Sequence, residues 1–173
     1  MSNKILIKNK YLKYDMLAEM FNIGVGKSAS LLSEIINKKI ILNVSKIDVF
    51  CCEERNEKLE AFLSKVTDGT LMVSSIEFKE KITGEANLIF PTDKMRVFIN
   101  LCMNKEMNNY EFDTDFTDID FDIIKEIGNI VLNSIIGEMS NFLNVSLNYS
   151  LPKVKIFDKK KFKLGISNRE QSC

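Results

Sequence analysis

The chain has 173 residues, the size of one domain or of two small halves of one domain. Its 24 Lys and Arg residues balance 24 Asp and Glu residues, so no net positive charge attracts nucleic acid or an anionic membrane. The chain contains no histidine, which excludes Ser-His triads, Cys-His dyads and histidine-based metal sites. Any chemistry must therefore use carboxylates, amides, hydroxyls, lysines or the active site of a partner.

The first part of the chain is predicted to form a long helix, then strands, then a short helix. Apolar residues at helical spacing indicate the helix over 12–37, and β-branched residues indicate a strand over 40–50. An Asp-Gly pair between two further apolar runs is a hairpin signal. The strands of this hairpin, and the strand expected to follow them, cover residues 59–66, 71–79 and 82–90.

The rest of the chain is predicted to contain a short helix, a polar acidic linker, a second long helix and a final strand. Proline is tolerated in a first helical turn, so Pro91 can open the short helix. A second proline, Pro152, interrupts the final strand. In chain order these elements cover Pro91–Cys102, 105–118, Ile119–Leu143 and 145–157.

The cysteines and the apolar runs indicate the compartment. No stretch approaches the ~20 apolar residues of a membrane span, and the N-terminal apolar run is too short for a signal peptide. The cysteines form no Cys-x-x-Cys pair, which argues against a zinc ribbon or a thioredoxin-type site. We therefore expect a cytoplasmic protein with free, reduced thiols. The four cysteines are Cys51, Cys52, Cys102 and Cys173.

The two long helices match each other at a fixed offset of 107 residues. An aspartate, a glutamate and an asparagine recur at positions i, i+4 and i+7, which lie on one narrow stripe of a helix. The matched pairs are Asp15 with Asp122, Glu19 with Glu126, Asn22 with Asn129, Ile23 with Ile130, Ser33 with Ser140, and Asn37 with Asn144. Each copy is expected to be followed by a strand. The repeat predicts one domain over residues 1–173, with pseudo-two-fold halves at about 12–104 and 119–173.

In the second copy, apolar residues lie opposite the polar stripe. These residues are expected to face the sheet, and they are Ile124, Ile127, Val131, Ile135 and Phe142. The stripe would then face water or a partner. A plain solvated helix face explains one such stripe, but the same three residue types in both helices favour a functional surface. Asparagine is also a poor helix former that a solvent face does not need.

The repeated stretches resemble the signature helices of the CheC/CheX/FliY chemotaxis phosphatases. In this family Asp or Ser is followed after three residues by Glu, after two more by Asn, and after twenty-two more by Pro. The second copy matches throughout, whereas the first has Ser45 in place of the Pro and Phe21 in place of the Gly that usually precedes the Asn. The two-copy pattern is most similar to CheC, and the resemblance covers roughly residues 12 to 157.

The resemblance implies an α+β fold with an antiparallel sheet and the two signature helices side by side on one face. CheC-like chains usually continue for several strands after the Pro, but fewer than 25 residues follow Pro152 here. We therefore expect either an abbreviated second half or a sheet completed by a partner or by a dimer mate.

The resemblance further implies a hydrolase that removes the aspartyl phosphate of a CheY-type response regulator. The regulator would bring the phosphorylated Asp, a Lys and the Mg²⁺, so the chain needs no cofactor or metal of its own. By carry-over, Glu126 and Glu19 would pair with the regulator's Lys, while Asn129 and Asn22 would hold a water in line with the phosphorus. An amide does not titrate near pH 7, so positioning is the role that suits it.

Two other functions are compatible with parts of the sequence. The same helices could bind a response regulator, a CheD-type deamidase or a flagellar switch component without hydrolysis. The segment Gly24–Ser28 partly resembles a phosphate-binding loop, but the full pattern needs Gly where Phe21 stands. The second copy is expected to be the better site, because it has Gly128 and Pro152. Phe21 either packs in the core or narrows access to the first site.

Overall fold

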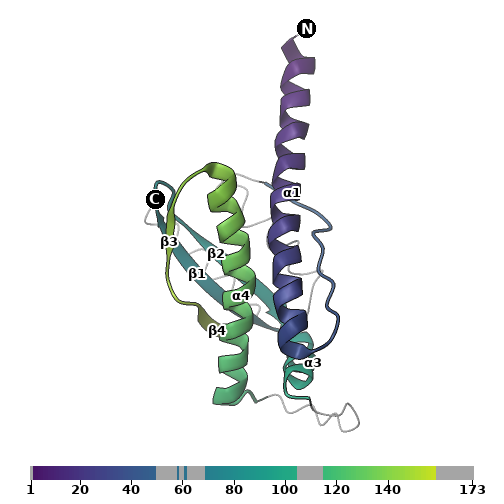
Figure 1. The fold of residues 1–173 in the computed structure, drawn as a ribbon, viewed down its shortest axis with the longest axis vertical. Coiled ribbons are helices and arrows are strands. Elements are labelled where there is room, and N and C mark those ends of the chain that lie inside the picture. The colour runs from purple at the N-terminus through teal and green to yellow at the C-terminus, as the bar shows by residue number, and fades with distance from the viewer. Residues whose placement is uncertain (1, 50–57, 59–60, 62–68, 105–114, 159–173) are drawn as a thin grey trace. The chain divides into compact units, whose positions relative to one another are not determined.

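The computed structural model describes residues 2–49, 58, 61, 69–104 and 115–158 (Figure 1). It confirms an α+β fold with an antiparallel sheet. In chain order the elements are α1 (Ser2–Ile36), β1 (Thr70–Glu80), β2 (Gly84–Pro91), α3 (Thr92–Cys102), α4 (Asp118–Leu143), β3 (Leu147–Tyr149) and β4 (Lys153–Asp158). None of the helices in these ranges has the length and apolar character that a membrane crossing requires.

β1 is the strand to which the other three pair. β2 lies on one side of it, and the end of β1 pairs antiparallel with β3, so that Phe78 is opposite Tyr149. The beginning of β1 pairs antiparallel with β4, so that Thr70 is opposite Asp158. The strands predicted at 71–79 and 82–90 are confirmed as β1 and β2. The strand predicted at 145–157 is confirmed as β3 and β4, which are separated around Pro152.

The chain divides into two compact units. The first contains Met1–Asp48, Ile76–Ala86 and Asn129–Leu151, and the second contains Val49–Ser75, Asn87–Gly128 and Pro152–Cys173. The organisation as a single domain of two pseudo-repeat halves stays a prediction.

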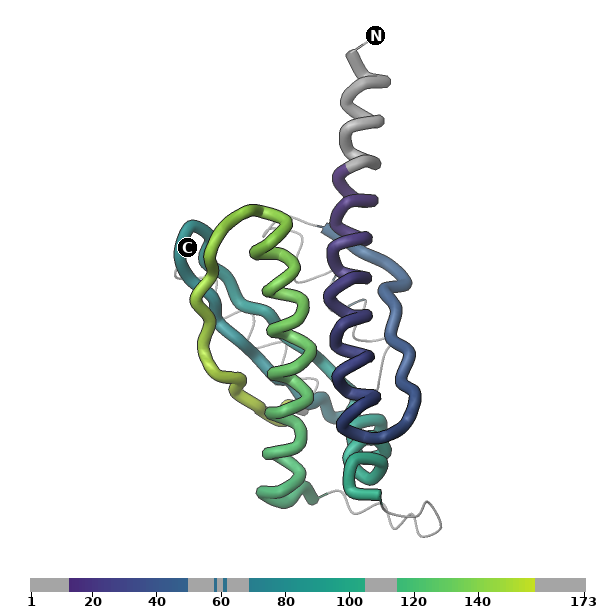
Figure 2. The backbone as a smooth tube through the Cα atoms, viewed as in Figure 1, coloured from purple at the N-terminus to yellow at the C-terminus, as the bar shows by residue number. Residues whose placement is uncertain are grey.

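In the first unit, α1 lies beside the part of α4 that begins at Asn129 (Figure 2). A methyl group on Gly24 would lie 2.9 Å from the Cα atom of Ile135, so a glycine is needed for this close helix approach. Lys27 and Glu138 form an ion pair between the same two helices. The apolar residues buried in this unit are Met20, Ala29, Leu32, Ile36, Ile76, Phe78, Val131, Leu132, Ile136 and Leu147.

The predicted apolar face of α4 is confirmed for part of its length. Ile124, Ile127 and Val131 are buried, and Ile135 is half-buried. The prediction is wrong for Phe142, whose side chain is 45% exposed. Phe142 stands in the last turn of α4, one residue before the helix ends, where less structure remains to cover a side chain.

In the second unit, the start of α4 is joined to α3 by one buried acid. The Asp120 carboxylate accepts the Thr117 backbone N–H at 2.8 Å, and the Thr117 hydroxyl accepts the Asp120 N–H at 3.3 Å, a reciprocal helix cap. Arg96 of α3 donates to the same carboxylate at 2.9 Å and to the carbonyl of Asp115 at 2.6 Å. The guanidinium also stacks 4.1 Å from the centre of the Phe116 ring. These contacts fix where α4 begins.

Both long helices end in the same way. Asn37 and Asn144 have left-handed backbone angles, with φ of 53° and 51°. The next N–H groups, of Lys38 and Val145, bond back to the carbonyls of Ser33 and Ser140 at 3.2 and 3.1 Å. The Asn37/Asn144 match of the repeat is therefore explained by helix termination, and the Ser33/Ser140 match lies at the same helix ends.

The strand predicted over 40–50 is wrong, because residues 39–49 form no regular element. Side chains of α1 take up the backbone groups that a strand partner would need. The N–H of Ile40 donates to the Ser33 hydroxyl at 2.9 Å, and the N–H of Val44 donates to the Asn22 amide at 3.0 Å. The segment therefore follows α1 as an extended strap (Figure 2), and residues 39–49 supply no strand after the first copy of the repeat.

The remaining sequence predictions concern helices and loops. Helices were predicted for Pro91–Cys102 and Ile119–Leu143, and these are confirmed as α3 and α4. α1 begins ten residues before the predicted start at residue 12. The strand predicted over 59–66, its Asp-Gly turn and most of the acidic linker over 105–118 lie outside the described residues.

Candidate functional site

The polar stripe of α1 lies on the surface, as predicted. Asp15, Glu19 and Asn22 are all exposed, while Met20 and Gly24 on the other side of the helix are buried. Within the described part of the chain, the Glu19 carboxylate forms no hydrogen bond or ion pair. It is therefore available to a cationic group of a visiting molecule.

The Asn22 side chain has one of its polar groups in use. Its Oδ1 accepts the Val44 backbone N–H at 3.0 Å, which ties the amide to the strap over 39–49. A carbonyl oxygen has two lone pairs and the amide nitrogen has two hydrogens. Asn22 can therefore still accept one hydrogen bond and donate two to a molecule at the surface.

The stripe of α4 has a similar character. Asp122 and Glu126 are exposed, and Asp122 pairs with Lys125 at 2.9 Å one turn further on. Glu126 has no ion pair or hydrogen bond to any residue that the structure describes. Asn129, three residues beyond Glu126 on the same helix, is half-buried. A carboxylate and an amide with this spacing stand on one side of a helix.

The amide of Asn129 is held by a residue that the sequence analysis missed. Its Oδ1 accepts a hydrogen bond from Nδ2 of Asn133, one turn further along α4, at 2.7 Å. The Asn133 Oδ1 is buried and meets no donor among the described residues. Leaving a buried carbonyl without a partner costs about 1–3 kcal/mol. The sequence does contain a signal for Asn133. It is an asparagine four residues after the motif, in a helix interior, where asparagine is unfavourable.

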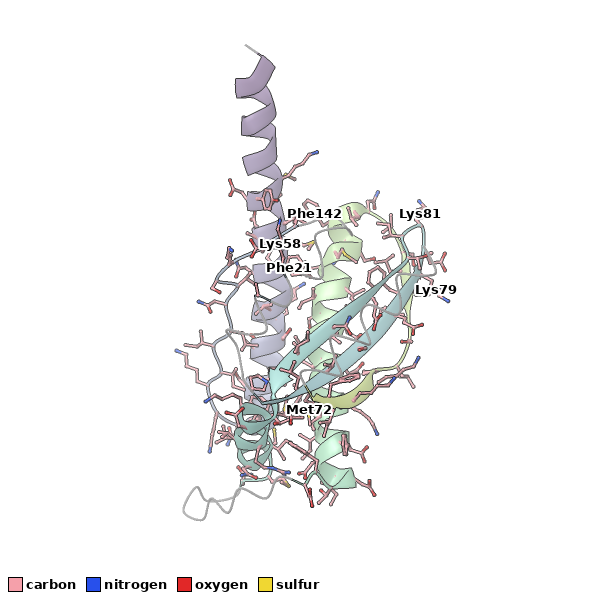
Figure 3. The ribbon with its side chains drawn as sticks, turned by 180° about the vertical axis from the view of Figure 1, so that it is seen from behind. Phe21, Lys58, Met72, Lys79, Lys81 and Phe142 are labelled. Carbon is pink, nitrogen blue, oxygen red and sulfur yellow. The ribbon has the colours of Figure 1, made fainter. Side chains whose placement is uncertain are left out.

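The residues that precede the two asparagines differ for a structural reason. A methyl group on Gly128 would lie 2.1 Å from Oγ of Ser74 on β1, so α4 approaches the strand too closely for any side chain there. Phe21, at the equivalent place on α1 (Figure 3), is half-buried. Part of its ring therefore contributes to packing, and the rest stands at the surface next to Asn22.

The segment Gly24–Ser28 is not a phosphate-binding loop. It lies within α1, and the Ser28 hydroxyl is buried and donates to the Gly24 carbonyl at 2.8 Å. Among the described residues, no group of three or more Cys, Asp or Glu side chains is arranged to hold a metal ion. The groups available at either stripe are thus an unpaired carboxylate and a neutral amide. Such groups can bind and orient, but they contain no strong nucleophile.

Comparison with known proteins supports the predicted resemblance. No family model matches the chain. The sequence is 26% identical over 145 residues to the CheY-P phosphatase CheC of Bacillus subtilis, covering 82% of this chain and 65% of CheC. The chain thus corresponds to less than two thirds of the length of that relative. The fold is similar to that of FliY of Thermotoga maritima, with a TM-score of 0.68 and 23% identity over 85% of this chain and 69% of FliY. The chain is therefore similar in sequence to CheC and in fold to FliY.

Proposed function

We propose that this CheC-like chain hydrolyses the aspartyl phosphate of a CheY-type response regulator, with one site on each signature helix. The observation that carries the proposal is the repeated outward-facing pair of an unpaired glutamate and a tethered asparagine. These pairs are Glu19 with Asn22 and Glu126 with Asn129. The similarity to a CheY-P phosphatase supports the choice of substrate.

The glutamates would set the position of the partner. Each is exposed and forms no ion pair within the described part of the chain, so binding a lysine of the regulator breaks no existing contact. The Coulomb attraction within an ion pair is stronger when a docked protein excludes water from it, and complementary charges also set the register of docking. Glu19 and Glu126 would therefore fix the register in which the helix meets the phosphorylated site.

The asparagines would orient the attacking water. The water oxygen attacks phosphorus while the bond from phosphorus to the aspartyl oxygen breaks, and the aspartate leaves as a carboxylate. The two water hydrogens end on inorganic phosphate or in solvent. The carboxylate is a good leaving group, so holding the water in line provides much of the rate. Mg²⁺ would arrive with the regulator, and this chain would supply only the docking carboxylate and the amide.

A second candidate function is binding without hydrolysis. One lone pair of each amide oxygen is already in use. The chain could then act as an adaptor for a response regulator, a CheD-type deamidase or a flagellar switch component. A CheD-type partner and a homodimer stay predictions.

The test is the decay of a phosphorylated CheY-type regulator, followed with and without the protein. We expect the wild type to accelerate decay and the double variant Asn22→Ala/Asn129→Ala to lose that acceleration while still binding. Asn141→Ala is the matched control, because Asn141 is exposed on α4 and away from the stripe. Equal decay with wild type, double variant and buffer would leave only the adaptor function.

A further inference from the structure

We propose that Asn133 is a positioning residue for the second site, and that it acts by fixing the orientation of the Asn129 amide. This inference rests on the proposed phosphatase function. Asn133 lies one turn beyond the Asp-Glu-Asn motif on the same side of α4, and it does not belong to the repeat, since the equivalent position in the first copy is Gly26.

The contact between the two amides is direct. Asn133 Nδ2 donates to Asn129 Oδ1 at 2.7 Å, and the two residues stand one turn apart on α4. The terminal torsion of an asparagine is broad, so an isolated Asn129 amide would sample both orientations. In the hydrogen bond between the two side chains, Oδ1 of Asn129 points toward Asn133.

The buried oxygen of the half-buried Asn133 favours a role beyond packing. Its Oδ1 is buried and has no donor among the described residues, so the side chain satisfies only part of its hydrogen-bonding capacity. An apolar residue of similar size would avoid that loss. Asn133 thus gives up stability, and the side-chain hydrogen bond that it does form among the described residues goes to the proposed water-orienting amide.

The first site reaches the same result by other means. Gly26 has no side chain, and the Asn22 Oδ1 is held by the Val44 backbone N–H at 3.0 Å. In both sites one donor from the chain itself occupies one lone pair of the amide oxygen. The other lone pair and the amide hydrogens stay available for the water. In the second site the donor is a side chain, that of Asn133, and a substitution can remove it.

The test uses regulator dephosphorylation in an Asn22→Ala background, where only the second site can act. We expect Asn133→Ala and Asn133→Leu each to lower kcat about fivefold with KM for the phosphorylated regulator unchanged. Asn141→Ala is the control. In an Asn129→Ala background the same Asn133 substitutions should have no further effect, because the amide they orient is absent.

The outcomes separate the inference from the proposed function. An unchanged kcat in the Asn22→Ala background, or an equal loss in both backgrounds, overturns the positioning role while the phosphatase function stands. If the wild type fails to accelerate decay, the phosphatase function is lost. The positioning contact is then judged by NMR. Asn133 side-chain amide protons should exchange more slowly than those of Asn141, and Asn133→Ala should shift the Asn129 side-chain amide signals. Equal exchange rates, or unmoved Asn129 signals, overturn the inference.

Discussion

The signature segments of α1 and α4 contain the same three polar residues but hold them differently. On α1 the asparagine is tied to the backbone of a strap that follows the helix, through the Val44 N–H. On α4 it is tied to a side chain of its own helix, Asn133. The repeat therefore specifies which groups reach the surface, whereas the neighbouring structure determines how firmly each group is held. A backbone donor survives almost any substitution, but a side-chain donor does not.

The two segments also differ in their place along the helix. The segment on α4 begins two residues after Asp120, which caps the helix and binds Arg96. The segment on α1 begins at Asp15, well inside a helix that starts at Ser2. The position of the second stripe thus depends on one buried ion pair, and the first stripe has no such anchor at its start among the described side chains.

The largest expected effect is on the rate of regulator dephosphorylation. Removing one orienting group from a phosphoryl-transfer site typically lowers the rate by ~10²–10³. Asn22→Ala and Asn129→Ala should each remove the contribution of one helix, and the double variant should match buffer. Measuring kcat for both single variants shows which segment contributes more to the rate. We expect the larger decrease in kcat for Asn129→Ala. A double variant that still accelerates decay would show that neither asparagine is needed for the reaction.

The next effect is on stability, at the anchor of α4. Asp120→Ala should lower the free energy of unfolding by about 3 kcal/mol, because the Arg96 guanidinium loses its buried partner and the helix loses its cap. Asp118→Ala, at an exposed acid of the same first turn, should cost less than about 1 kcal/mol. Urea unfolding of the two variants measures the difference. Equal losses would show that Asp120 is not an anchor.

The same anchor should depend on pH. Burial raises the pKa of Asp120, but the Thr117 N–H and the Arg96 guanidinium outweigh burial and bring it below its usual value. A lowered pKa in the folded state means that the stabilisation is complete above the unfolded pKa of about 3.9 and is lost as the pH falls through the folded value. The stability gap between wild type and Asp120→Asn should therefore be constant above about pH 5 and narrow below about pH 4. A gap that widens on acidification would contradict this assignment.

A smaller effect separates two glycines of α1. Gly24→Ala should destabilise by about 1–2 kcal/mol, because the new methyl meets the backbone of Ile135 at 2.9 Å. Gly26→Ala should stabilise by roughly 0.5–1 kcal/mol, because no atom lies within 4 Å of its added methyl and alanine is the better helix former. Thermal unfolding of both variants is the measurement. Shifts of the same sign would show that α1 and α4 do not pack as described.

The smallest expected effect is on kcat of the first site, when the arrangement of the second site is copied onto α1. Gly26→Asn places an asparagine four residues after Asn22, as Asn133 stands after Asn129, and the space there is open. In an Asn129→Ala background, kcat should change less than about twofold, because the Val44 N–H already holds the Asn22 amide. A large gain would show that the backbone donor holds Asn22 poorly.

The sequence predicted which residues reach the surface better than it predicted the contacts that hold those residues in place. The stripe residues follow from helical periodicity, which needs no knowledge of tertiary structure, and the strands and helices from Thr70 onward follow from local composition. The strand expected at 40–50 failed, because its β-branched residues were judged without the α1 side chains that take up its N–H groups. Arg96 and Asp120 were missed for a similar reason, since they are 24 residues apart in the sequence.

Asn133 has a consequence for any attempt to make the protein more heat-resistant. Replacing it with leucine removes a buried oxygen that meets no donor in the described structure, so the variant should unfold at a higher temperature. On the proposed mechanism the same variant should turn over more slowly. A screen that selects only for thermal resistance would then favour this substitution and lower the catalytic rate. Such a trade-off between stability and activity is expected where an active-site residue is itself destabilising.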